Sequence, residues 1–135
     1  MYVDSDVLFA LLKPNDRHYS FAAYVCALKD RFYCSAAALM EVEIVVKREI
    51  SDYASQHVLE ALKQKMPSLN IVSLDQKTFL KSQELRQQLG LGIFDSIHAA
   101  TALAKDKRMA STDHIFDHVR GLECIRPPAF YSTSK

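Results

Sequence analysis

The chain has 135 residues, of which 49% are hydrophobic, and its formal net charge at pH 7 is +1. A chain of this length and composition folds as one globular domain with a sizeable core, which excludes a disordered protein. The near-neutral charge argues against a uniformly basic protein that coats nucleic acid, but it is compatible with an enzyme that has a local basic patch.

Targeting signals and glycine-rich nucleotide sites are not expected. The apolar runs VLFALL and EIVV are too short to span a membrane, and Asp4 and Asp6 interrupt the first of the apolar segments, unlike a signal peptide. The three glycines form neither a Walker loop nor a GxGxxG motif. Cys26, Cys34 and Cys124 are odd in number and lack CxxC spacing. We therefore expect core thiols in a reducing cytoplasm rather than disulfides or a zinc site.

Short apolar runs predict five strands, at residues 1–4, 31–35, 69–74, 108–112 and 122–125. Apolar periodicity and cap residues predict the helices between them. We expect these helices at residues 5–13, from Asp16 along the stripe Phe21, Val25 and Leu28, at residues 36–49, 52–66, 75–89 and 93–104, and briefly after Asp113.

Strands that alternate with helices predict a parallel sheet with helices on both faces, which is a three-layer α/β/α sandwich. We expect a single domain over residues 1–126 and a C-terminal extension over residues 127–135. In such folds ligands bind beyond the carboxyl ends of the strands, where the strand order reverses. The first residues after each strand are therefore the candidate site residues.

Three acids in the first half of the chain stand out by their positions. Asp4 follows the first strand, where it either caps the next helix or belongs to a site at the sheet edge. Asp6 fits a first-turn acid that complements the helix dipole. Glu41 is harder to explain structurally, because its helical neighbours three and four residues away are all apolar. A charge on such a face is costly unless something pairs with it.

The second half of the chain adds further polar candidates. Asp95 opens a predicted helix among small neighbours, where it either complements the helix dipole or lies close to a substrate. His98, one turn later, fits a hydrogen-bonding partner or core residue better than a ligand. Thr112 or Asp113 could cap the helix HIFDHV, and Asp117 lies one turn further along, facing solvent or a metal's outer shell.

If the first and fourth strands are neighbours, Asp4, Glu41, Asp95 and Asp113 converge. Carboxylates gathered in one cleft repel one another unless they are protonated or neutralised by a cation. Oxygen donors without a Cys or His ligand set favour Mg²⁺ or Mn²⁺ over zinc. An ion held by carboxylates and waters commonly serves phosphate chemistry, so the acids predict a metal-dependent reaction at a phosphate.

Four stretches resemble a known family in their order and spacing: YVDSDVLFALL, SAAALMEVE, LGIFDSIHAATAL and MASTDHIFDHV. They are similar to the motifs of PIN-domain ribonucleases, and in particular to the VapC-type toxins of prokaryotic toxin–antitoxin pairs. The resemblance runs from Tyr2 to about Ile125. It implies a PIN fold with a parallel five-stranded sheet over residues 1–126, and a metal-dependent endoribonuclease activity.

The resemblance also assigns roles to residues of this chain. It implies four acids that bind metal and act in catalysis: Asp4, Glu41, Asp95 and Asp113. It implies four auxiliary residues beside them: Ser5, Asp6, Thr112 and Asp117. Asp6 is a departure, because the family more often has Asn or Ser there. His98 falls at a variable position and stays outside the implied catalytic set.

The cofactor implied by the resemblance is Mg²⁺ (or Mn²⁺), and the implied products carry a 5′-phosphate and a 3′-hydroxyl. The implied partners are an RNA substrate, a cognate antitoxin protein that silences the enzyme, and a second copy of the chain in a homodimer. Cations that could contact the RNA backbone are Lys13, Arg17, Lys47, Arg48 and Arg86.

Three other functions remain open at this point. A haloacid-dehalogenase-like phosphatase would use VDSDV, with Asp4 as nucleophile and Asp6 as acid. However, Leu8 stands where such enzymes usually have Thr, and two of the four acids would have no role. A response-regulator receiver would need a Lys near the end of the last strand, where LECIR offers only Arg126. A non-catalytic PIN domain that only binds a partner is the third alternative.

Overall fold

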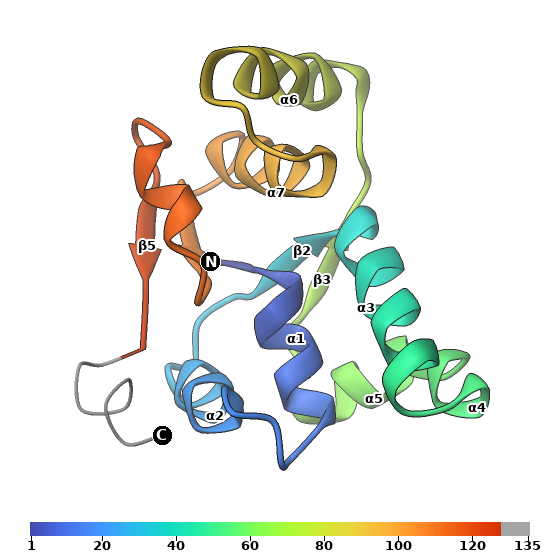
Figure 1. Cartoon of the computed structure of the whole chain (residues 1–135). Coiled ribbons are helices and arrows are strands. Elements are labelled where there is room, and N and C mark those ends of the chain that lie inside the picture. Colours follow the sequence, from blue (N-terminus) through green and yellow to red (C-terminus); the bar gives the residue numbers. More distant parts are fainter. Residues whose placement is uncertain (128–135) are drawn as a thin grey trace.

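The computed structural model describes residues 1–127, in which five short parallel strands form one sheet (Figure 1). The sheet order is β3-β2-β1-β4-β5. The strands are β1 (Tyr2–Val3), β2 (Tyr33–Ser35), β3 (Asn70–Val72), β4 (Arg108–Ala110) and β5 (Glu123–Ile125). The predicted five-stranded parallel sheet is confirmed, and each strand is shorter than expected. The expected extension lies outside the described residues from position 128 onward.

The helices cover both faces of the sheet, which confirms the three-layer sandwich. They are α1 (Ser5–Leu12), α2 (Tyr19–Ala27), α3 (Ala36–Glu49), α4 (Asp52–Ser55), α5 (Val58–Lys65), α6 (Gln76–Leu89), α7 (Ile93–Leu103) and the 3₁₀-helix η1 (His114–His118). Figure 1 shows α7 above the sheet with α6 outside it, and α1 with α2 below it.

The central strand β1 is the point where the order of strands reverses. From β1 the chain proceeds to β2 and β3 on one side, and it then crosses to β4 and β5 on the other. Tyr2 pairs with Tyr33 of β2 and with Met109 of β4. Residues that follow β1 and β4 therefore leave the sheet at the same edge, which is where ligands bind in folds of this kind.

The core forms around this central strand, since both residues of β1 have no exposed surface. Strands covered on both faces are apolar throughout, in contrast to the alternating pattern of a half-exposed sheet. Phe21, Leu62 and Met109 are among the largest fully buried side chains. Each such side chain contributes about 1.5–3 kcal/mol by leaving water. Among the described residues, no helix has the length and apolarity to cross a membrane.

The prediction of one helix over residues 52–66 is wrong, because the chain forms two helices there, α4 and α5. The backbone N–H of Gln56 donates to the carbonyl of Tyr53 at 3.2 Å, and that of His57 donates to Ala54 at 3.1 Å. These three-residue spacings tighten the turn and end α4. The break turns Val58 to the core and leaves Leu59 43% exposed, which a continuous apolar pattern does not reveal.

The helix expected from Asp16 begins three residues later, at Tyr19. The Asp16 carboxylate accepts a hydrogen bond from the backbone N–H of His18 at 2.9 Å. Asp is prone to such local turns, which compete with helix formation. Leu28 is also not part of the buried stripe, because it lies at the C-terminal end of α2 and is 37% exposed.

The predicted end of α6 at the glycines is confirmed, and Gly90 produces it. Its backbone is left-handed, with φ of 70°, and its N–H donates to the carbonyl of Arg86 at 2.9 Å. Glycine is favoured there because a side chain disfavours this conformation. Gly92 then forms the N-cap of α7 with an ordinary φ of −68°. This short connection sets where α7 begins and therefore where Asp95 lies.

We expect Gly90→Ala to destabilise the protein by about 1 kcal/mol, because alanine disfavours a left-handed backbone. Gln87→Ala is the matched control, because Gln87 is an exposed residue of the last turn of α6, where the helical backbone suits alanine. Urea unfolding of the two variants and the wild type measures the difference. Equal destabilisation by both substitutions would contradict the role given to Gly90.

Candidate active site

The four predicted acids come from four elements that meet at the carboxyl edge of the central strands. Asp4 is the N-cap of α1, directly after β1, and Asp113 is the N-cap of η1, shortly after β4. Asp95 lies in the first turn of α7, and Glu41 in α3. Burial raises the pKa of Asp95, and the charges of Asp113 and Glu41 raise it further, against the effect of His98.

Asp4 is the most deeply placed of these acids, with 4% of its surface exposed. Its Oδ1 accepts the backbone N–H of Ser5 at 2.8 Å, and its Oδ2 accepts the hydroxyl of Ser111 at 2.7 Å. Burial and the neighbouring charge of Asp6 nevertheless raise the pKa of Asp4 to about 7. The two donors orient the carboxylate but do not replace the water it has lost.

Asp6 holds the loop after β4 against the start of α1. Its Oδ2 accepts the backbone N–H of Thr112 at 3.1 Å and also the Thr112 hydroxyl. Its Oδ1 is buried without a hydrogen-bond partner among the described residues. A buried carboxylate oxygen without a donor is costly, and a cation would satisfy it. Asp6 and Thr112, two predicted auxiliary residues, therefore contact each other directly.

His98 lies between two of the predicted acids. Its Nε2 is 2.7 Å from Oε1 of Glu41 and 3.7 Å from Oδ1 of Asp4. Burial lowers the pKa of His98, but the bond to Glu41 and the charge of Asp4 outweigh burial and raise it overall. Burial likewise opposes ionisation of Glu41, yet the His98 bond holds the pKa of Glu41 below its ordinary value.

Sequence reasoning missed two residues that support these acids, Tyr2 and Ser111, whereas it fitted His98 to a hydrogen-bonding partner or a core residue. The Tyr2 hydroxyl is 2.6 Å from Nδ1 of His98, and Ser111 bonds to Asp4. The available signal for His98 was its spacing of three residues from Asp95, which places both on one helical face. The roles of Tyr2 and Ser111 depend on side-chain directions at a sheet edge, which spacing alone does not give.

Asp113 and Asp117 lie at the exposed end of the site. The Asp113 Oδ1 accepts the backbone N–H of Ile115 at 2.9 Å, and the Asp113 N–H donates to the hydroxyl of Ser111 at 3.0 Å. Arg126 bonds to the Asp117 carboxylate and donates to the Asp113 carbonyl at 2.7 Å. The bond from Arg126 holds the pKa of Asp117 below its ordinary value. Asp117 thus helps to fix the loop that carries Asp113.

A family model described as the PIN domain matches residues 1–122. The chain belongs to the PIN-domain family. This confirms the family expected from the four motifs, and the match spans all the elements that carry the acids of this PIN domain. A search among curated proteins returned no match.

Solved structures similar to this PIN domain support the same fold. VapC20 of Mycobacterium tuberculosis, described as a sarcin-ricin loop cleaving toxin, aligns at a TM-score of 0.77 and 17% identity, over 93% of this chain and 98% of that one. A toxin–antitoxin complex from Klebsiella pneumoniae aligns at 0.68 and 22%, over 94% and 97%. VapBC2 from Rickettsia felis, bound to a promoter DNA fragment, aligns at 0.72 and 17%, over 93% and 96%.

The donor set of this PIN domain suits a hard divalent cation. The acids offer only oxygen, the donor preferred by Mg²⁺ and Mn²⁺. The raised pKa values of Asp4 and Asp95 and the unpartnered Oδ1 of Asp6 all indicate a local shortage of positive charge. Within residues 1–127, no three His, Cys, Asp or Glu side chains already form a metal-binding group.

The predicted RNA-contacting cations are mostly engaged in other contacts. Lys13 is 3.7 Å from Glu49, and Arg48 is 3.1 Å from the same side chain. Arg86 is only partly exposed, and its guanidinium donates to the hydroxyl of Ser96 at 2.7 Å, which links α6 to α7. Its role is therefore in helix packing.

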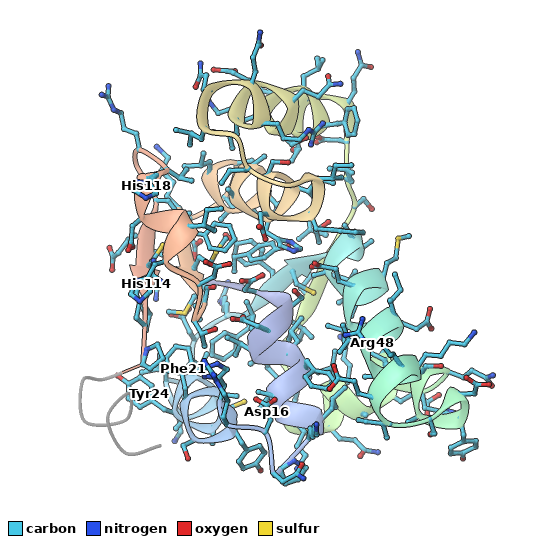
Figure 2. All side chains as sticks on the ribbon, viewed as in Figure 1. Asp16, Phe21, Tyr24, Arg48, His114 and His118 are labelled. Carbon is cyan, nitrogen blue, oxygen red and sulfur yellow. The ribbon has the colours of Figure 1, made fainter. Side chains whose placement is uncertain are left out.

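A groove of about 330 Å³ lies between α1 and α3, next to the acids. Its lining combines three apolar side chains with four carboxylates. Figure 2 shows Asp16 near the end of α1 and Arg48 on α3. The groove is lined by Ser5, Asp6, Phe9, Asp16, Glu41, Val42, Val45 and Glu49.

In the presence of EDTA, we expect Asp4→Asn to be more stable than the wild type at pH 8, and we expect this gain in stability to be smaller at pH 5. The raised pKa means that protonation of Asp4 favours folding below its unfolded pKa, and that this benefit is lost as pH rises through about 7. The ionised buried group costs up to about 4 kcal/mol at high pH, and asparagine avoids that cost. Urea unfolding at both pH values measures the difference.

Asp75→Asn is the control, because the effect of the Asp75 charge on stability changes with pH in the opposite direction. The backbone N–H of Thr78 donates to this exposed cap and holds the pKa of Asp75 below its ordinary value. Its stabilising effect is therefore present at high pH and is lost as pH falls. If Asp4→Asn lowers stability at pH 8, the buried charge is already compensated and this interpretation is wrong.

Proposed function

We propose that this PIN domain is a Mg²⁺- or Mn²⁺-dependent endoribonuclease, and that it is the toxin of a toxin–antitoxin pair. The observation that supports the activity most strongly is the acidic site itself. The negative charge of its deeply placed carboxylates is not fully compensated by nearby positive groups. VapC20, the similar toxin that cleaves the sarcin-ricin loop, supports RNA as the substrate class.

In this proposal Asp4, Glu41, Asp95 and Asp113 hold the metal. When bound there, the ion supplies an activated water and offsets negative charge on the phosphate oxygens. The Ser111 hydroxyl donates to one oxygen of Asp4 and accepts the backbone N–H of Asp113. This one hydroxyl therefore helps to fix the positions of two of the proposed ligands relative to each other. Phosphodiester hydrolysis then leaves a 5′-phosphate and a 3′-hydroxyl.

Asp6 has a supporting role here rather than that of a phosphatase acid. One of its oxygens is occupied by both donors of Thr112. A general acid of the dehalogenase type needs a carboxyl that is free to exchange a proton with the substrate. Asp6 instead keeps the loop that carries Asp113 beside α1.

We expect the wild type to cut a mixed cellular RNA pool at discrete sites with Mg²⁺ or Mn²⁺, and not with EDTA. Asp4→Asn and Asp95→Asn each remove a charged ligand, so cleavage should fall by about 100-fold or more, which corresponds to about 2.7 kcal/mol of lost transition-state stabilisation. Asp75→Asn is the control, because it removes an acid from an exposed helix cap and should cleave like the wild type.

Full activity in both site variants would defeat the assignment of the acids. If the wild type cuts no RNA with either metal, release of phosphate from an aryl phosphate tests the phosphatase alternative. If that assay is also negative, a non-catalytic PIN binding module becomes the preferred function.

The proposed partner is an antitoxin that presents basic side chains to the groove between α1 and α3. The four carboxylates that line this groove favour a cationic segment, and the apolar side chains beside them favour an amphipathic one. Two of the similar structures are described as VapBC2 and as a toxin–antitoxin complex. We also propose a homodimer, since Met40 and Ile44 of α3 are 59% and 57% exposed.

Light scattering should give twice the chain mass for the purified protein, and a larger complex after addition of the product of the adjacent gene. Glu49→Lys reverses one charge of the groove and should weaken that complex, because like charges then meet. Glu60→Lys, at an exposed position of α5, is the charge-matched control. A monomeric mass would refute the homodimer, and an unchanged mass after mixing would refute this antitoxin.

A further inference from the structure

A continuous chain of hydrogen bonds runs through the core beneath the acidic site. The backbone N–H of Ser35 donates to the Tyr2 hydroxyl oxygen at 3.2 Å. The Tyr2 hydroxyl lies 2.6 Å from Nδ1 of His98, and Nε2 of His98 lies 2.7 Å from Oε1 of Glu41. Tyr2 and His98 have no exposed surface, whereas 27% of the Glu41 side chain is exposed. The chain therefore opens only at Glu41.

This chain of bonds starts and ends on the same helix. Ser35 is the N-cap of α3, and Glu41 lies in α3 itself. Between them, the bonds pass through Tyr2 of β1 and His98 of α7. Both ends of the chain are therefore fixed to one rigid element, and the middle is fixed to the central strand and the opposite layer. Such a closed arrangement allows the Glu41 side chain little freedom.

Each polar group along the chain has a partner, although a buried histidine and a buried tyrosine hydroxyl are costly without one. The Glu41 carboxylate can only accept, so Nε2 of His98 donates to it whichever charge the ring carries. Burial raises the pKa of Tyr2 well above its usual value, so the phenol keeps its proton and remains a neutral partner for Nδ1.

The ring of His98 also determines the spacing of two carboxylates. The same Nε2 stands 2.7 Å from Glu41 and 3.7 Å from Asp4. Without a donor between them the two acids would repel each other, and Glu41, at the edge of the buried face of α3, could turn to solvent. The bond to His98 draws the Glu41 carboxylate inward, toward Asp4.

We propose that His98 is a positioning residue that holds Glu41 in the acidic site, and that Tyr2 fixes the ring that does so. This proposal rests on the proposed function, because it concerns the same acids, but it can be tested without RNA. Partners of this kind, which orient a metal ligand, typically change metal affinity or activity by about 10–100-fold when removed.

Three substitutions test the proposal. His98→Leu removes the donor to Glu41 while keeping an apolar body, and His98→Gln retains an N–H that can reach Glu41. Tyr2→Phe removes only the hydroxyl that fixes the ring. The matched control is Thr101→Val on α7, because Thr101 is also buried and its hydroxyl donates only to the carbonyl of Ile97, at 2.7 Å.

The first measurement is Mn²⁺ binding by calorimetry in the absence of RNA. We expect His98→Leu to weaken the Mn²⁺ Kd by about 10-fold or more, and Tyr2→Phe to weaken it less, since the ring stays but is no longer fixed. His98→Gln should recover most of the affinity. Thr101→Val should also lose stability, because it removes a buried hydrogen bond, yet it should bind Mn²⁺ like the wild type.

The second measurement is RNA cleavage, with kcat and KM determined separately. A displaced ligand should lower kcat by about 10-fold or more in His98→Leu with little change in KM, because the RNA-binding surface is untouched. Rescue by His98→Gln distinguishes positioning from mere packing. If His98→Leu does not fold, the comparison of His98→Gln and Tyr2→Phe with Thr101→Val decides the same question.

Wild-type Mn²⁺ affinity and kcat in the folded His98 and Tyr2 variants would overturn the proposal and leave the proposed function intact. Conversely, a wild type that cleaves no RNA would refute the proposed function. In that case a selective loss of Mn²⁺ affinity in His98→Leu, restored in His98→Gln, would still support the positioning role.

Discussion

The charge of Asp4 at the end of the central strand is the constraint to which the surrounding structure responds. A carboxylate that is 4% exposed has lost most of its water, and its ionised form is costly there. Ser5 and Ser111 supply two donors, and His98 stands 3.7 Å away. Because its pKa is still raised to about 7, these contacts compensate the charge only in part. An ordinary helix cap, such as exposed Asp75, shows the opposite shift.

Sheet topology explains why residues more than a hundred positions apart share this environment. β1 pairs with β4, so the segments after Val3 and after Ala110 leave the sheet side by side. The backbone N–H of Asp4 donates to the carbonyl of Ala110 at 3.0 Å, which ties the two exits together directly. The hydroxyls of Ser111 and Thr112, adjacent residues after β4, then reach Asp4 and Asp6 after β1. The extra acid at position 6 therefore has a structural partner.

The sequence could predict those features that depend on periodicity and on strand order. Alternating strands and helices predicted the three-layer sandwich, and Gly90 correctly marked the end of α6. The apolar surroundings of Glu41 correctly indicated a polar partner, and that partner is His98. What spacing could not give was which side chain would pair with which, because this depends on rotamers where layers meet. The sequence fits His98 to a hydrogen-bonding partner or a core residue, and His98 is both, but its position between two acids follows only from the packing of α7 against α3.

Burial decreases across the site, from Asp4 at the strand end, through the half-buried Glu41 and Asp95, to the exposed Asp113. In the proposed function, a substrate phosphate would approach from the exposed side, with Asp113 facing it and Asp4 behind. The loop that carries Asp113 is correspondingly fixed from two directions, by Asp6 through Thr112 and by Arg126 through its bonds to Asp117 and to the Asp113 carbonyl. The acid nearest to solvent is thus held by neighbouring charges, whereas the buried acids are held by hydrogen bonds through the core. Both kinds of support hold the acids close together, although their like charges repel one another.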